Sequence, residues 1–158
     1  MKTKNLYFLP ISLSEKITAT YSSSPAHHGW LKNAIDFLAP LGTPIRASLD
    51  GEVLRVKDDS EIGGDTRDFD KHGNFVEIQH SNGEVSIYEH IEKGSARVKA
   101  GNQVKTGEIL AAVGQTGWMG SLGPHLHFDV HKYYGQGLND YKSLEIRWID
   151  PPPNKEGL

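Results

Sequence analysis

The sequence predicts an all-β domain, mostly antiparallel and sandwich-like, with a groove, long loops and little helix. The chain holds 17 Gly and 8 Pro in 158 residues, a balance that favours short strands joined by tight turns. An Asn-Gly pair at Asn82 and Gly83 separates two strand-like segments, 74–80 and 84–91, which is a strong hairpin signal. Residues 124–131 alternate apolar and polar side chains with period two, as a half-buried strand does.

The length of the chain favours one domain. A chain of 158 residues can bury one substantial core but is short for two. We expect a lead-in segment, 1–26, that packs on the core and ends in a polar loop at 21–25. The domain itself is expected at 27–150. A Pro-rich tail, 151–158, follows, because proline lacks the backbone donor that a central strand or helix requires.

The remaining elements are predicted from short apolar segments between turn residues. Residues 34–38 have strand character, and 44–48 and 51–56 flank an Asp-Gly turn signal, which indicates a hairpin. Residues 57–73 are dense in charge and glycine, which predicts a long surface loop. Residues 98–114 combine spaced apolar positions with glycines and predict short strands joined by turns.

Composition excludes several classes of function. A net charge of −3 and a pI of about 6.2 give no broad basic surface, so we expect no nucleic-acid partner. Without cysteine, disulfides and thiolate metal sites are impossible. No run approaches the roughly 18 apolar residues of a membrane span, and residues 1–10 carry no clear signal peptide. The oligomeric state stays open.

A set of histidines and one aspartate carries the chemical signal. On an extended strand His125 and His127 point to one face, while Leu126, Phe128 and Val130 point to the other. Taken alone, a His-x-His pair is equally typical of a polar solvent face. Further candidates are Asp36, inside an apolar strand segment, the pair His27 and His28 upstream of it, and His90 at a strand end. One Asp and two His would make a zinc triad with the fourth position left to water.

Three separated motifs carry a family resemblance. Residues 34–47 (AIDFLAPLGTPIRA), 88–91 (YEHI) and 123–130 (GPHLHFDV) occur in the order found in the lysostaphin/LytM-type zinc endopeptidases, and the chain resembles that family over residues 27–131. The resemblance implies a LytM-type peptidase domain at 27–150, Zn²⁺ as cofactor and peptidoglycan stem or cross-bridge peptides as substrate. It also implies a periplasmic or extracellular location.

Transferred position by position, the resemblance implies that Asp36 and His127 bind zinc, and that His90 and His125 are unligated catalytic histidines. One of these two would accept a proton from water, and the other would stabilise the oxyanion. The common form of the family has its first histidine four residues before the aspartate, where this chain has Lys32. His27 is therefore our choice for the third ligand, with His28 as the alternative, because neighbours on an extended chain face opposite ways.

Other histidines and aromatic residues receive ordinary structural interpretations. His72 lies in the polar loop, and His80 and His131 are expected as exposed imidazoles at strand ends. Trp30, Trp118 and Tyr88 are candidates for a peptide groove, although aromatics in a β-domain are more often core residues. Trp118, in a glycine-rich loop, is the best groove candidate.

Two other functions remain as alternatives. The segments around Gly51, 98–104 and 107–110 also resemble lipoyl- and biotinyl-type carrier barrels, which need a lysine at a hairpin tip. The other alternative is a non-catalytic β-domain that binds cell wall or activates another hydrolase. The sequence does not identify the scissile bond, which depends on loops such as 57–73.

Overall fold

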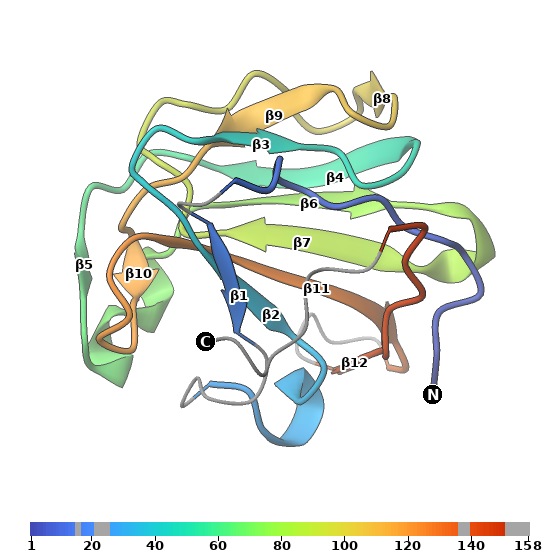
Figure 1. The fold of residues 1–158 in the computed structure, drawn as a ribbon, viewed down its shortest axis with the longest axis horizontal. Coiled ribbons are helices and arrows are strands. Elements are labelled where there is room, and N and C mark those ends of the chain that lie inside the picture. Colours follow the sequence, from blue (N-terminus) through green and yellow to red (C-terminus); the bar gives the residue numbers. More distant parts are fainter. Residues whose placement is uncertain (15–16, 21–25, 136–139, 151–158) are drawn as a thin grey trace.

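The computed structural model describes residues 1–14, 17–20, 26–135 and 140–150. These residues form a mostly antiparallel β-structure (Figure 1), which confirms the predicted all-β class. Helix within the described ranges is limited to short 3₁₀ segments, namely η1 (Gly29–Leu31), η2 (Arg67–His72) and η3 (Ser81–Gly83). No helix of this part of the chain is long and apolar enough to cross a membrane.

One large sheet forms the centre of the molecule. Its strands pair antiparallel, and β12 (Tyr141–Ser143) also pairs with β11. Across the sheet the order is β1 (Thr18–Thr20), β2 (Ile35–Leu38), β11 (His125–Tyr133), β7 (Val85–Glu89), β6 (Phe75–Gln79), β4 (Gly51–Lys57) and β8 (Gln103–Val104).

The predicted hairpin over 44–56 is wrong. Strand β3 (Pro44–Arg46) pairs with β9 (Ile109–Ala112), whereas β4 pairs with β6 and β8. The turn between β3 and β4 is held by a distant residue, Thr106. Asp50 Oδ1 accepts hydrogen bonds from both the backbone N–H and the hydroxyl of Thr106. The chain therefore leaves β3 for the large sheet instead of folding back on itself.

The Asn-Gly hairpin is confirmed, since β6 and β7 are joined by η3 with Asn82 at φ 62° and Gly83 at φ 65°. The predicted loop 57–73 carries η2, which has no buried residue, and β5 (Gly63–Gly64). Strand β5 pairs parallel with β10 (Gly117–Trp118). Strand β10 also lies close to the residue that follows η2, since a Cβ atom on Gly117 would meet the Gly73 Cα atom at 2.6 Å.

The two faces of β11 divide the molecule into core and site. Leu126, Phe128 and Val130 are fully buried in the hydrophobic core, as the period-two pattern predicts, and Tyr7 and Ile11 of the lead-in pack into the same core. The other face carries His125, His127, Asp129 and His131, which are also buried. Burial on this face has to be offset by hydrogen bonds, ion pairs or a metal, because these side chains are polar.

Candidate metal centre and groove

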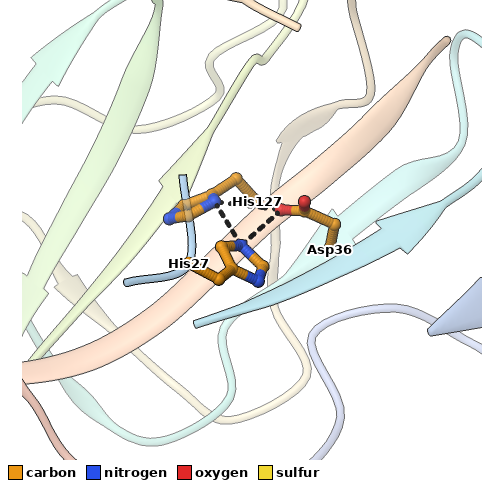
Figure 2. A group of neighbouring side chains, drawn as sticks. All are labelled: His27, Asp36 and His127. Atoms are coloured by element: carbon orange, nitrogen blue, oxygen red, sulfur yellow. Dashed lines mark hydrogen bonds and ion pairs between the residues drawn. The ribbon is translucent and has the colours of Figure 1, made fainter. Parts of the chain in front are cut away.

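Three side chains meet on the polar face of the sheet (Figure 2). His127 Nδ1 lies 2.9 Å from Asp36 Oδ1, and His27 Nε2 lies 3.2 Å from that oxygen and 3.4 Å from His127 Nδ1. All three residues are buried. Nitrogen and oxygen atoms of three side chains thus converge on one point.

Strand register explains how these residues meet. His127 on β11 is the direct partner of Asp36 on β2, so the two side chains project side by side from one face. His27 reaches them from the segment before η1, whereas the neighbouring His28 is exposed and lines a groove. The structure therefore brings His27 to the cluster and leaves His28 outside it.

The cluster fits a zinc ion. Two ligand atoms on a tetrahedral zinc, each about 2.0–2.1 Å from the metal, lie about 3.3 Å apart, close to the spacings found here. Asp36 Oδ2 is buried without a hydrogen-bond partner among the described residues. A hollow of about 10 Å³ lies beside Asp36, His90, His125 and His127. Two imidazoles and a carboxylate are also a donor set that catalytic zinc sites use.

The electrostatics of Asp36 favour cation binding. Burial alone would raise the pKa of this carboxyl, but hydrogen bonds from His127 and His27 outweigh burial and hold the pKa well below its usual value. The group is therefore ionised at neutral pH and can act as an anionic ligand.

His90 and His125 lie together beside the cluster without belonging to it. Their ring centroids are 4.6 Å apart, and His125 Nε2 lies 3.8 Å from Asp36 Oδ1. His90 Nδ1 is 2.7 Å from the Thr116 carbonyl oxygen, and His125 Nδ1 is 2.9 Å from that of Gly123. A carbonyl only accepts, so each Nδ1–H donates and each Nε2 keeps a lone pair.

Both histidines are held in the neutral form. Burial, followed by the neighbouring His125 and His127, lowers the pKa of His90 to about 3. Burial also lowers the pKa of His125, although the Asp36 carboxylate opposes this. His90 has a left-handed backbone with φ 65°, and such a conformation at a non-glycine residue is typical of functional positions.

A different environment surrounds His131, four residues further along β11. Its Nδ1 lies 2.7 Å from Asp129 Oδ1, and its Nε2 lies 3.4 Å from Glu77 Oε1. Burial opposes the charge, but Asp129 and then Glu77 raise the pKa of His131 to about 9. Burial would raise the pKa of Glu77, yet hydrogen bonds from His131, Arg55 and Tyr133 lower it to about 2. These groups form a charged array.

A groove of about 970 Å³ crosses this face of the sheet. The sheet strands β11, β7, β6 and β4 contribute lining residues, among them His127, Arg55 and Lys57. The lining also includes residues of η2 and Trp118 of β10, which contact each other, and residues of η1 and Tyr141 of β12, which contact each other as well. An open groove of this size beside the cluster has room for an extended peptide.

Comparison with known proteins decides the family. A model of peptidase family M23 matches residues 31–140, which include Asp36, His90, His125 and His127 but not His27. The chain belongs to peptidase family M23. The resemblance to lysostaphin/LytM-type endopeptidases that the three motifs indicate is thereby confirmed. One relative, from Buchnera aphidicola and 36% identical over 111 residues, is named an uncharacterized metalloprotease.

Similar M23 proteins include longer chains and an isolated domain. The DD-carboxypeptidase/endopeptidase Mpg of Neisseria meningitidis is 41% identical over 120 residues, 75% of this chain and 24% of Mpg. The peptidoglycan DD-endopeptidase ShyA of Vibrio cholerae is 37% identical over 124 residues, 78% of this chain and 25% of ShyA. This chain thus spans about a quarter of these relatives.

Among solved structures, the catalytic domain of the prophage-encoded M23 protein EnpA from Enterococcus faecalis, solved as a point mutant, has a TM-score of 0.60. It is 32% identical to this chain, over 87% of this chain and 93% of that one. The described fold therefore corresponds to nearly the whole of an M23 catalytic domain.

Several expectations for individual M23 residues need correction. His131 and His80 are buried rather than exposed. Both ring nitrogens of the buried His80 have hydrogen-bond partners, namely the Asp50 carbonyl oxygen and the Ser86 hydroxyl, each at 2.8 Å. Tyr88 is a core residue and does not line the groove, whereas Trp118 and Trp30 do. His72 lies at the end of η2 and is half-buried.

Sequence reasoning missed three carboxylates of the site, Asp129, Glu77 and Glu89. Glu89 on β7 pairs with His127, and its Oε2 atom lies 4.0 Å from His127 Nε2. Burial raises the pKa of Glu89. The signal for Asp129 was present, because residues 125, 127, 129 and 131 share one face of a strand. Glu77 and Glu89 require the pairing of distant strands to be known.

Proposed function

We propose that this chain is a zinc metalloendopeptidase that hydrolyses peptide bonds in peptidoglycan stem or cross-bridge peptides. His27, Asp36 and His127 would hold the zinc ion, and His90 and His125 would act on the substrate and water. The observation that carries the proposal is the pair of neutral imidazoles whose Nε2 atoms are left open beside a three-ligand cluster.

The chemistry divides between the ion and the two histidines. Zinc, when bound, supplies a water of pKa near 7 and polarises the scissile carbonyl. His90 and His125 each have Nδ1–H tied to a backbone carbonyl, so each open Nε2 atom has a lone pair that can accept the proton of the attacking water. The same Nε2–H can then pass that proton to the leaving amine.

The assignment of oxyanion stabilisation follows from the same tautomers. A neutral imidazole with its proton on Nδ1 has no donor at Nε2. Whichever of His90 and His125 has accepted the proton is therefore the one that can also donate a hydrogen bond to the developing oxyanion.

The groove and the relatives support a cell-wall peptide as substrate. Trp118 and Trp30 line the groove and offer apolar contact, and η2 contributes the cations Arg67 and Lys71 with one acidic residue, Asp70, between them. Peptidoglycan stem peptides carry free carboxylates, which these cations complement. ShyA is named a peptidoglycan DD-endopeptidase. Action on this substrate places the protein in the periplasm or outside the cell.

The two alternatives have less support. A lipoyl- or biotinyl-type carrier needs a lysine at a hairpin tip, and the tip between β6 and β7 is Ser81-Asn82-Gly83. A cell-wall-binding or hydrolase-activating domain has no use for a complete set of candidate ligands with two further histidines. Failure to bind zinc would bring both alternatives forward.

The test is digestion of purified peptidoglycan with zinc-loaded protein, with and without chelator, and mass spectrometry of the released fragments. We expect fragments with new peptide termini that disappear with chelator and with His127→Ala. His28→Ala is the matched control for metal binding, because His28 is exposed outside the cluster, and it should keep zinc. A zinc-loaded protein that releases no fragment from several peptidoglycan types would contradict the substrate, and a protein that binds no zinc would contradict the mechanism.

A further inference from the structure

A line of alternating acid and base runs from His127 along the sheet, away from the proposed zinc ligands. Asp129 Oδ2 lies 3.7 Å from His127 Nε2, and Asp129 Oδ1 lies 2.7 Å from His131 Nδ1. Glu77 Oε1 follows at 3.4 Å from His131 Nε2. The Arg55 guanidinium ends the line by donating a 2.6 Å hydrogen bond to Glu77 Oε2. The line runs from the candidate ligand His127 to Arg55, and both residues line the groove.

Two atoms at the near end of this line face each other without a partner. Asp129 Oδ2 and His127 Nε2 are both buried and lack a hydrogen bond within the described part of the chain. A buried polar atom left in this state destabilises the folded protein, because it has lost its water without gaining a partner. An N–H···O hydrogen bond spans about 2.9 Å, so a movement of under about 1 Å would satisfy both atoms.

The tautomer of His127 connects this contact to the metal. Nδ1 of His127 is the nitrogen that faces Asp36 and His27. If Nδ1 gives its lone pair to zinc, the neutral ring keeps its proton on Nε2, and that proton points at Asp129. A carboxylate there fixes the tautomer and the orientation of the ring and makes the ligand more basic.

We propose that Asp129 is a positioning residue that holds His127 as a zinc ligand, and that His131 and Glu77 hold Asp129 in turn. The proposal rests on the zinc site of the proposed function. The support behind Asp129 is rigid, because His131 is 1% exposed and its ring stacks on Tyr141 with centroids 4.3 Å apart. Asp129 therefore cannot turn away without losing its 2.7 Å hydrogen bond with His131.

Glu89 is the competing acceptor. Its Oε2 atom lies 4.0 Å from the same His127 Nε2, but its side chain is 34% exposed towards the groove. A carboxylate that water also reaches orients a ligand less strictly than one enclosed by protein. Replacing each carboxylate with its amide distinguishes the contribution of Asp129 from that of Glu89, since Asn and Gln keep the shape of the side chain and remove its charge.

The experiment measures zinc affinity by competition with a chromophoric chelator for the parent chain, Asp129→Asn, Glu89→Gln and Tyr133→Phe. Asp129→Asn should weaken zinc binding by about 10–100-fold. Glu89→Gln and Tyr133→Phe should bind zinc as the parent does. Tyr133→Phe is the matched control, because it removes a hydrogen bond to Glu77 on the same face of β11, while Arg55 and His131 still hold Glu77 and Asp129 is untouched. A weaker zinc affinity in Glu89→Gln with none in Asp129→Asn overturns the proposal.

A second readout needs no variant. Long-range ¹H–¹⁵N spectra of the zinc-loaded parent chain should show His127 protonated at Nε2, with that proton protected from exchange. A zinc-loaded His127 protonated at Nδ1 overturns the proposal even if Asp129→Asn does not fold. A parent chain that binds no zinc is a different result, because it defeats the proposed function itself.

Discussion

The groove face of β11 has two ends at which the pKa of histidine is shifted in opposite directions. At the first end, burial lowers the pKa of His125 and of the neighbouring His90, and each ring donates Nδ1–H to a backbone carbonyl. At the second end, burial acts on His131 in the same direction, but Asp129 and Glu77 outweigh it and raise the pKa to about 9. One strand face thus holds neutral and charged imidazoles.

The difference shows that the hydrogen-bond partner, rather than burial, decides the charge of these rings. His90, His125 and His131 are exposed by 8%, 2% and 1%. A carbonyl fixes a tautomer without adding charge, whereas a carboxylate stabilises the imidazolium. The first end therefore keeps open lone pairs for proton transfer, and the second end keeps a fixed cation for structure.

The largest expected effect comes from removing a ligand at the first end. His27→Ala should lose zinc and reduce peptidoglycan hydrolysis to background, because the ring supplies one of three converging ligand atoms. His28→Ala should retain zinc, because His28 is exposed outside the cluster. Metal content by mass spectrometry and fragment release measure the outcome. The opposite result would assign the third ligand to His28. The backbone before η1 would then have to rotate so that the His28 side chain faces the cluster in place of His27.

A smaller effect is expected from the two open imidazoles. His90→Gln and His125→Gln should each lower kcat by about 10²–10⁴-fold, the range for loss of a positioned general acid or base, while zinc content is unchanged. His80→Gln is the matched control, since His80 is buried but bonded through both nitrogens far from the cluster. If kcat falls only together with zinc content, His90 and His125 act as ligands, and the contrast with the cluster is lost.

The sequence predicts the parts of the fold that local pattern determines. The Asn82-Gly83 hairpin and the two faces of β11 depend on turn chemistry and on period-two alternation, and both are confirmed. The pairing of β3 fails because its partner β9 is distant in the chain and because Thr106 fastens Asp50. The loop at 21–25 and the tail at 151–158 lie outside the described residues.

The site divides in the same way. Asp36, His90, His125 and His127 are gathered as the motifs predict, and the roles assigned to them stay predictions. His131 and His80 were expected to be exposed but are buried. The sequence does not predict this, because exposure at a strand end depends on which distant loop covers it. The partners of His131 show the limit: Asp129 is visible in the alternation, but Glu77 enters through the pairing of β6 with β7 and of β7 with β11.

The smallest expected effect concerns stability at the second end. The folded pKa of His131 is about 9, against 6.5 for a free imidazole, so the folded state holds this proton more tightly than the unfolded state. The stabilisation is fully present below pH 6.5 and is lost as pH rises through about 9; the shift corresponds to roughly 3 kcal/mol. Urea unfolding at pH 6 to 10 should therefore show a falling free energy of unfolding.

The slope, rather than the absolute stability, decides this prediction. His131→Gln leaves Asp129 and Glu77 buried without their cation, so it should be less stable than the parent at pH 6. Between pH 6 and 10 the variant should lose less stability than the parent, because the His131 proton is absent. His127 contributes to the slope of both proteins, since burial lowers its pKa but the neighbouring carboxylates of Asp129 and Asp36 hold the pKa well above its usual value. Asp129 and Glu77 do not add to this slope, since burial raises the pKa of each but His131 and other partners lower it below its usual value, so both stay ionised. A parent and variant with equal slopes would mean that His131 is neutral in the folded state, and the two ends of β11 would then hold histidine in the same way.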